Sequence, residues 1–144
     1  MGEHTYDGGA GAYDRFTGRW SRLYVPCLVA AAEVASGHSV LDVAAGTGDS
    51  SVALAKRGAE VVSTDFTHAM LALGPSKFQK KGLNGLIWAS SDADAQKLPF
   101  KDATFDGITS CYGIRNVEVR ASAYAEFLRV LKPGGQLTIL EFSA

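Results

Sequence analysis

Asp42 and the glycine-rich turn that follows it have the residue types that could hold a polar ligand. Asp42 lies near the end of an apolar stretch, and the turn Gly46-Thr47-Gly48 follows that stretch. Glycine lets the backbone approach a ligand closely, and the helix expected after the turn presents unpaired N–H groups there. A Gly-x-Gly turn alone also suits an ordinary strand-to-helix connection.

Two further aspartates favour a ligand site. Asp65 closes the next apolar stretch, 17 residues after Gly48, where a carboxylate can accept both hydroxyls of a ribose. Asp94 follows the third stretch, where it can accept from an exocyclic amine while the Ala95 N–H faces a ring nitrogen. Together these residues predict a ligand that contains a nucleoside.

The same turn argues against a dinucleotide. The Gly-x-Gly-x-x-Gly fingerprint needs a glycine where this chain has Ser51, and Asp42 would repel a pyrophosphate. A nicotinamide-dependent dehydrogenase is therefore a disfavoured alternative. An acid at this place suits a ligand with a cationic amino-acid end. S-adenosylmethionine combines such an end with a ribose and an adenine.

The elements that must position these residues alternate along the chain. Five strands are expected, at 39–44, 60–65, 85–90, 105–112 and 136–142. Helices are expected at 50–58, 67–73 and 120–132, and Gly74-Pro75 shortens the second of them. This alternation predicts an α/β fold: a doubly wound, Rossmann-like parallel sheet of order 3-2-1-4-5 with helices on both faces. Ligands of such sheets bind at the C-terminal ends of the strands.

The chain of 144 residues suits a single domain. We expect a helical N-terminal segment over 1–36 and the Rossmann-like core over 37–144. The aromatic residues Tyr13, Phe16 and Trp20 suit either a lid over the ligand or a helix packed on the sheet.

The composition indicates which classes of partner and which cellular location to expect. A net charge of -1 gives no general attraction to nucleic acid. Cys27 and Cys111 belong to no cluster of metal ligands, so no metal site is expected. No apolar run approaches the roughly 20 residues of a membrane span, and the first residues do not resemble a signal peptide. These features predict a cytoplasmic protein.

Several stretches resemble a known family. VLDVAAGTGD (40–49) resembles motif I of the class I S-adenosylmethionine-dependent methyltransferases, and DAQKLPFKDATFDGIT (94–109) is similar to their adenine-side loop and fourth strand. YGIRNV (112–117) and RVLKPGGQLTILEFS (129–143) are similar to the UbiE-type C-methyltransferases of ubiquinone and menaquinone biosynthesis. The resemblance covers about residues 38–143.

The resemblance implies S-adenosylmethionine as the cofactor and methyl transfer to a small aromatic or lipid-like acceptor, such as a prenylated quinol. The residues that it implies for cofactor binding are Asp42, Ala44, Gly46, Gly48, Asp65, Phe66, Asp94, Ala95 and Cys111. It places Arg115 and Asn116 beside the methyl group as catalytic residues. Arg115 could stabilise a phenolate or orient a water; the alternative is a structural arginine that binds a carbonyl or Glu141.

The sequence departs from the family at its end. It stops after the fifth strand, where the family continues with a helix and an antiparallel strand pair. The alternative function is therefore a non-catalytic or truncated S-adenosylmethionine-binding module that needs a partner chain. An exposed edge at the fifth strand would suit a homo-oligomer, and a lipid-like acceptor would suit peripheral contact with a membrane.

Overall fold

The computed structural model describes residues 23–142, and only the backbone of residues 88–91. The aromatic residues Tyr13, Phe16 and Trp20, expected either as a lid or as helix packing, lie outside the described residues. In the described part of the chain, no helix combines the length and the hydropathy that crossing a bilayer requires.

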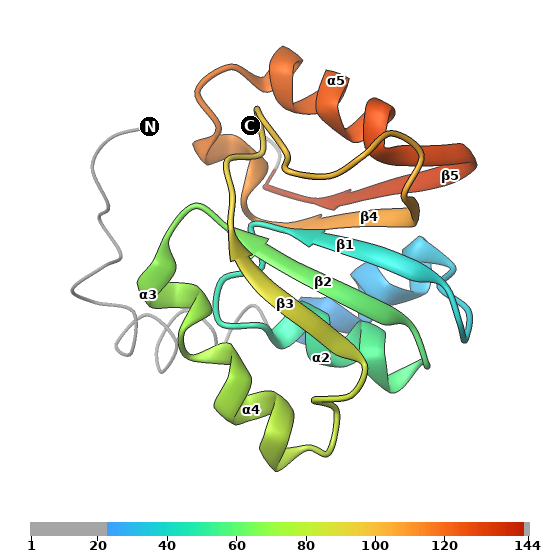
Figure 1. Ribbon diagram of the computed structural model, residues 1–144, viewed down its shortest axis with the longest axis vertical. Coiled ribbons are helices and arrows are strands. Elements are labelled where there is room, and N and C mark those ends of the chain that lie inside the picture. Colours follow the sequence, from blue (N-terminus) through green and yellow to red (C-terminus); the bar gives the residue numbers. More distant parts are fainter. Residues whose placement is uncertain (1–22, 143–144) are drawn as a thin grey trace.

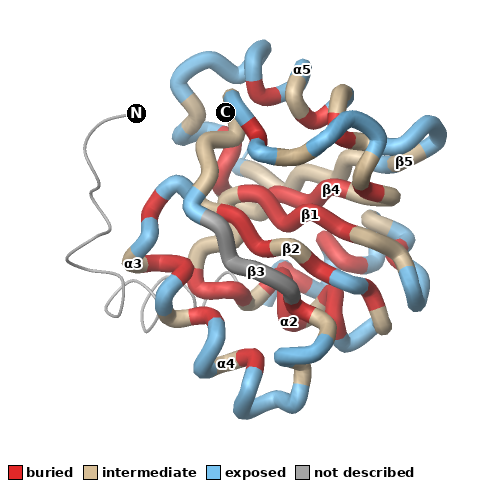
Figure 2. The backbone as a smooth tube through the Cα atoms, in the orientation of Figure 1, coloured by how far each residue is buried: buried red, intermediate tan, exposed pale blue. Residues whose placement is uncertain are grey.

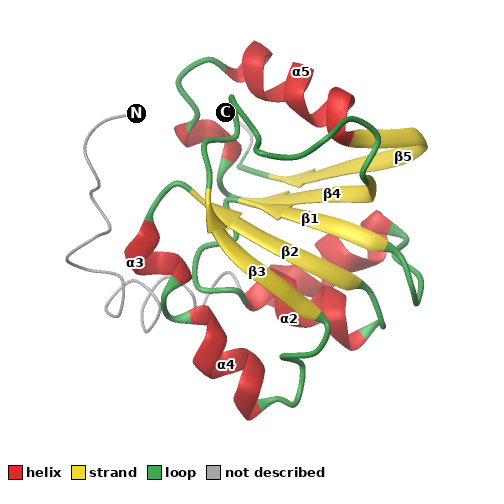
Figure 3. Cartoon of the chain, viewed as in Figure 1, coloured by secondary structure: helices red, strands yellow, loops and turns green. Residues whose placement is uncertain are grey.

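A five-stranded sheet forms the centre of the fold (Figures 1 and 3). Its strands are β1 (Ser39–Val43), β2 (Glu60–Asp65), β3 (Ile87–Asp92), β4 (Phe105–Cys111) and β5 (Leu131–Leu140). They lie in the order β3-β2-β1-β4-β5, and every neighbouring pair is parallel. The predicted strand order is confirmed, and all five C-terminal strand ends meet at one edge of the sheet.

Helices cover both faces of this sheet, as predicted (Figure 1). The helical elements are residues 23–32, α2 (Asp49–Lys56), α3 (His68–Leu71), α4 (Gly74–Lys80), the 3-10 turn η1 (Ile114–Asn116) and α5 (Arg120–Val130). Residues 23–32, α2 and α4 pack on one face, and α5 covers the other.

Alternation along the strands divides the core in two. Val40 packs with Leu54 of α2 and Phe78 of α4, whereas the next residue, Leu41, packs with Phe127 of α5. Figure 2 shows these buried residues concentrated in the middle of the sheet, while β5 at its edge is only half-buried. The core therefore fixes β1, β2 and β4, whose C-terminal ends carry the candidate site.

Two expected boundaries are wrong. The helix expected over 67–73 ends at Leu71, and α4 begins a new helix at Gly74 with Pro75 in its first turn, where the missing N–H is tolerated. The fifth strand begins at Leu131, which pairs with Phe105, while Gln136 pairs with Gly107. The Lys132–Gly135 stretch between these two pairs is a bulge of the strand.

Candidate functional site

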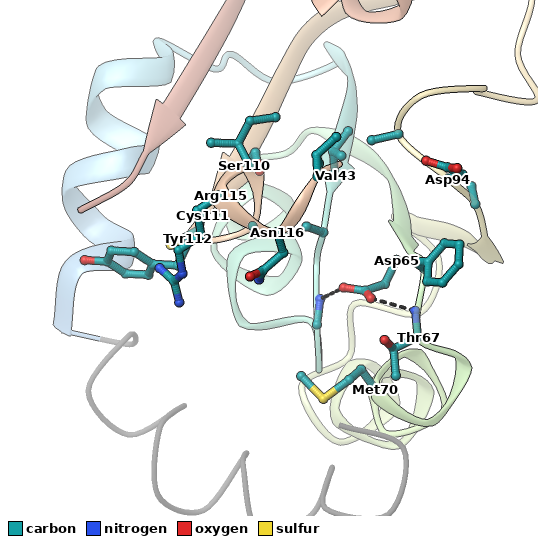
Figure 4. Close-up of a pocket in the computed structure, with 18 residues that line it drawn as sticks. Val43, Asp65, Thr67, Met70, Asp94, Ser110, Cys111, Tyr112, Arg115 and Asn116 are labelled. Atoms are coloured by element: carbon teal, nitrogen blue, oxygen red, sulfur yellow. Dashed lines mark hydrogen bonds between the residues drawn. The ribbon is translucent and has the colours of Figure 1, made fainter. Parts of the chain in front are cut away.

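The C-terminal strand ends surround a cavity of about 830 Å³, its open mouth included. Nine of the eleven predicted site residues line it: Ala44, Gly46, Asp65, Phe66, Asp94, Ala95, Cys111, Arg115 and Asn116. Asp42 and Gly48 do not. In the view of Figure 4, Asp65 and Asp94 lie on one side of the cavity, and Tyr112, Arg115 and Asn116 lie on the other.

Asp65 connects the end of β2 to the glycine-rich turn. Its Oδ2 accepts the Gly46 N–H at 2.9 Å, and its Oδ1 accepts the Thr67 N–H at 2.8 Å (Figure 4). Burial raises the pKa of this carboxyl, and the N–H groups of Thr67, Gly46 and Phe66 partly oppose that rise. The carboxylate also lines the cavity, so its remaining acceptor capacity is available to a hydroxyl of a ligand.

The glycine-rich turn is held close to Asp65. The Ala45 N–H donates to the Thr64 carbonyl at 2.8 Å, and the Gly48 N–H donates back to Ala45 at 3.0 Å. Gly46 has a φ of 58°, and a Cβ there would lie 3.3 Å from the Met70 Cε. The left-handed φ and the nearby methionine favour glycine at this position, and the bare backbone forms part of the cavity wall.

Gly48 has a structural task in place of the predicted contact with the ligand. It caps the N-terminus of α2 with a φ of 98°, and its Cα faces the ring of Phe78 in α4. A Cβ at this position would lie 2.6 Å from the Phe78 Cε1. The second glycine of the turn therefore lets α4 pack against the start of α2.

We expect Gly48→Ala to lower the free energy of unfolding by about 3 kcal/mol, because left-handed strain adds to overpacking. Urea denaturation measures this loss. Gly82→Ala is the matched control, since Gly82 has a φ of 67° but nothing within 4 Å of its Cβ position. Its loss should be about 1 kcal/mol. Equal losses in the two variants would contradict the packing role of Gly48.

Asp42 lies beneath the turn and does not reach the cavity. β1 continues to Val43, and alternation points the Asp42 side chain towards α2, where it is fully buried. Its carboxylate accepts from Ser51 Oγ at 2.7 Å and from Thr109 Oγ1 at 3.2 Å. Burial raises its pKa to about 7, against the opposing effect of these hydroxyls. The expected contact with a cationic ligand group is not formed by this geometry; Asp42 instead joins β1, α2 and β4.

The loop after β3 supplies the other acid of the site. Asp94 accepts from the Gln96 N–H at 2.9 Å and turns the chain so that the Lys97 N–H donates to the Asp94 carbonyl at 3.0 Å. Ala95 lines the cavity beside it, and Phe66 lies at the same cavity with 41% of its surface exposed. An exposed aromatic ring near a carboxylate and a loop backbone suits a flat, polar-edged ring system.

The opposite side of the cavity combines a cation with aromatic rings. Arg115 Nη1 donates to Glu141 Oε1 at 2.8 Å, and the Arg115 N–H donates to Glu141 Oε2 at 3.2 Å. Its guanidinium carbon lies 5.9 Å from the Tyr112 ring centre and 5.2 Å from that of Phe142. The structural pairing with Glu141 is thus present, and Arg115 also lines the cavity.

Two residues of the cavity wall have an unusual backbone. Ala44 and Tyr112, neither of them glycine, both have a φ of 56°. Such strain tends to persist where the surroundings impose it, often at functional sites. Gly113 follows Tyr112, and a Cβ there would overlap that of Ala44. The two strand ends therefore pass each other at close range.

Cys111 and Ser110 complete the wall at the end of β4. Burial raises the pKa of the Cys111 thiol to about 12, so it stays protonated and neutral at physiological pH. Ser110 is buried, and its Oγ has no hydrogen-bond partner among the residues that the structure describes. A buried hydroxyl without a partner on a cavity wall is a polar group that a bound ligand or water could satisfy.

Sequence reasoning missed several lining residues. Met70 and Thr67 line the cavity from α3 and its N-terminus, and Val43 lines it from β1. Thr67 is the first residue of the helix expected over 67–73; it is the N-cap of α3, and its side chain makes no capping hydrogen bond. Nothing in the local pattern marks Met70, because its contact with Gly46 joins segments distant in the sequence.

Comparison with known proteins places this geometry in a family. The profile of the ubiE/COQ5 methyltransferase family matches residues 19–144. The chain is 42% identical, over 133 residues, to the ubiquinone/menaquinone biosynthesis C-methyltransferase UbiE of Cellvibrio japonicus, covering 90% of this chain and 53% of that protein. It is 44% identical, over 122 residues, to the demethylmenaquinone methyltransferase of Thermobifida fusca, covering 85% of this chain and 51% of that protein.

Solved structures agree on the fold. A putative methyltransferase of Bacillus halodurans superimposes with a TM-score of 0.77 at 31% identity, covering 83% of this chain and 51% of that one. A SAM-dependent methyltransferase of Aquifex aeolicus superimposes with a TM-score of 0.81 at 23% identity, covering 95% and 73%. The chain spans about half the length of the curated relatives it matches. From the family profile and these identities, the chain belongs to the ubiE/COQ5 methyltransferase family.

Proposed function

We propose that the cavity binds S-adenosylmethionine and that the protein transfers its methyl group to a ring carbon of a small aromatic acceptor, such as a prenylated quinol. The observation that carries this proposal is Asp65. It is a carboxylate on the cavity wall at the end of β2, held in place by the glycine-rich turn and Thr67, where it can accept a ribose hydroxyl.

The other cavity residues fit the remaining parts of this cofactor. Asp94 can accept from the exocyclic amine of an adenine, with the Ala95 backbone and Phe66 beside it. The bare backbone at Gly46, which lines the cavity, suits the amino-acid end. The acceptors on the cavity wall therefore suit the ribose and the adenine of the cofactor.

The proposed acceptor class draws on the relatives and on the cavity. The relatives are named as C-methyltransferases of ubiquinone and menaquinone biosynthesis, and one as a demethylmenaquinone methyltransferase. In this chain, Tyr112 stacks on Phe142 with 4.6 Å between ring centres, beside the Arg115 guanidinium. A flat ring with an ionisable hydroxyl suits such a group of aromatic and cationic side chains.

Arg115 and Asn116 are the proposed catalytic residues. The cofactor, when bound, supplies a methyl group activated on a sulfonium. Loss of the ring hydroxyl proton to water would make the ring carbon nucleophilic. With the cofactor bound, the methyl carbon would pass from sulfur to that ring carbon, the electron pair of the carbon–sulfur bond staying on sulfur, and the ring carbon would then lose its own hydrogen as a proton to water, which restores the aromatic ring. Arg115 stabilises the resulting phenolate, and Asn116 orients the same oxygen or the water.

A second candidate is a cofactor-binding module that works with a partner chain. Its support is the position of β5, which pairs with β4 and forms one edge of the sheet of described strands. An edge strand can pair with another chain, so a homo-oligomer belongs to this proposal. The first candidate, the methyltransferase, is proposed to act in the cytoplasm and to contact the membrane surface through its lipid-like acceptor.

Calorimetric titration of the 144-residue chain with S-adenosylmethionine and S-adenosylhomocysteine tests the binding step. We expect saturable micromolar binding of both. The chain is then incubated with methyl-labelled cofactor and a reduced, short-chain demethylnaphthoquinol, and label should appear on a ring carbon. Binding without transfer would favour the module. A folded chain that binds neither ligand would contradict the first candidate for this chain alone and would favour a module whose site a partner chain completes.

A further inference from the structure

The loop between β3 and β4 is bonded to α5 at several places, including its middle, where the Leu98 N–H donates to Glu126 Oε2 at 2.8 Å. Towards the end of α5, the Arg129 guanidinium donates to the carbonyls of Leu98 and Phe100 at 3.1 and 2.7 Å, and to Asp102 Oδ1 at 2.9 Å. At the start of α5, Gln96 Oε1 accepts the N–H of Val119, the residue that caps the helix, at 3.1 Å. The loop that carries Asp94 is therefore attached to both ends of the helix.

Gln96 has a second partner at its other end. Its Nε2 donates to Asp94 Oδ1 at 3.3 Å, and its backbone N–H donates to the same oxygen at 2.9 Å. The two partners determine the orientation of the amide, because a carboxylate can only accept from Nε2 and an N–H can only donate to Oε1. Both Gln96 donors end on Oδ1, so Oδ2 can accept from a ligand.

Val119 lies directly beyond the segment that carries Arg115 and Asn116. η1 spans Ile114–Asn116, Val117 lines the cavity, and Val119 begins the first turn of α5. The Gln96 side chain therefore connects Asp94, on the proposed adenine side of the cavity, to the segment before α5, on the side proposed for the methyl acceptor.

We propose that Gln96 is a positioning residue. It links Asp94, the carboxylate proposed to bind the adenine, through Val119 to the side of the cavity proposed for the methyl acceptor. The inference rests on the proposed function for the identity of the ligand, but the link itself belongs to the ligand-free protein. When Asp94 is fixed by an exocyclic amine, Gln96 is held against Val119, and the first turn of α5 becomes more ordered. Binding of the adenine at one side of the cavity thereby orders the segment at the other side, where the methyl acceptor is proposed to bind.

The first experiment needs no ligand. The amides of Ser122 and Ala123 donate to the Val119 carbonyl at 3.1 and 3.3 Å, and neither residue lines the cavity. Their hydrogen exchange therefore reports on the link. We expect Asp94→Ala to speed their exchange about threefold in the natural sequence and to leave it unchanged in the Gln96→Met background. Equal effects of Asp94→Ala in both backgrounds would overturn the proposal.

The second experiment adds S-adenosylhomocysteine. We expect it to slow the exchange of Ser122 and Ala123 in the natural sequence, and this slowing should disappear in Gln96→Met. Gln96→Glu keeps the acceptor for Val119 but puts a like charge beside Asp94, so it should also abolish the slowing. Gln79→Met, which changes an exposed glutamine of α4, is the control and should behave as the natural sequence does.

The outcomes separate the link from the function. Slowing that survives in Gln96→Met would overturn the link while leaving the cofactor site intact. A natural chain that does not bind the ligand but still shows coupling between Asp94 and Gln96 would uphold the link and contradict the proposed function. In either case the melting temperature of Gln96→Met is compared with that of the natural chain. An unchanged melting temperature shows that the substitution acts locally, and a lowered one shows that it destabilises the whole fold.

Discussion

Asp65→Asn is expected to weaken the binding of S-adenosylhomocysteine about 100-fold. A hydrogen bond to a charged group contributes about 1.5–3 kcal/mol, and each factor of ten in affinity corresponds to about 1.4 kcal/mol. The carboxylate accepts two backbone N–H groups and, in the proposed complex, a ribose hydroxyl. An asparagine would turn its NH₂ group towards either the Gly46 N–H or the Thr67 N–H, so it loses a ligand contact and a support of the turn together. Calorimetry measures the affinity.

Asp92→Asn is the matched control for this variant. Asp92 ends the neighbouring strand β3, and its exposed carboxylate pairs with His68 at 2.8 Å without lining the cavity. The same chemical change there should alter affinity less than about threefold, since exposed pairs contribute about 1 kcal/mol or less. If both variants lose affinity equally, net charge and not the geometry of Asp65 governs binding. If neither does, the proposed ribose contact is wrong.

The sequence predicts the fold well because the signals are local. Each strand is a short apolar run ending near an acid or a turn, and parallel strand order follows from the alternation with helices. Asp65 could be located for the same reason: the last residue of a strand projects at the sheet edge where ligands bind. These inferences need only the chain on either side of the residue.

The placement of Asp42 could not be read in this way. The expected strand, 39–44, already places Asp42 before the strand end, and because side chains alternate between the two faces, its carboxylate points to the face that α2 covers and not into the cavity. Which face α2 covers is decided by packing between distant segments and not by the residues next to Asp42. Ser51 indicates the actual arrangement: the serine found where a dinucleotide fold has glycine donates a hydrogen bond to Asp42.

Contacts between distant segments were equally out of reach. The Val119 N–H reaches Gln96 across 23 residues, and Met70 meets Gly46 from a separate helix. Gln96 lies in the stretch that resembles the adenine-side loop of the family, but the resemblance gives it no role, and Met70 lies in no such stretch. Each acquires its place only when α5 or α3 packs on the sheet. The sequence therefore predicts the acids of the site but not the side chains that hold them.

Asp42→Asn should change how stability depends on pH. Burial raises the pKa of Asp42 from 3.8 to about 7, so between these values the folded chain binds a proton that the unfolded chain has released. The contribution of Asp42 to the free energy of unfolding therefore falls as pH rises through this range. Three pKa units at about 1.4 kcal/mol each amount to about 4 kcal/mol, of which about 3 kcal/mol is lost between about pH 5 and pH 8.

Asparagine cannot ionise, yet it can still accept from Ser51 and donate to Thr109 Oγ1. Urea unfolding at a series of pH values should therefore show Asp42→Asn gaining about 3 kcal/mol relative to the natural sequence between about pH 5 and pH 8. Asp106→Asn is the control: the Ser39 N–H and Lys132 lower the pKa of Asp106 from 3.8, so its contribution is lost only as pH falls below that value, and its difference from the natural chain should stay constant between about pH 5 and pH 8. A constant difference between Asp42→Asn and the natural chain across this range would mean that Asp42 is already ionised when buried, held by Ser51 and Thr109 strongly enough to offset its desolvation.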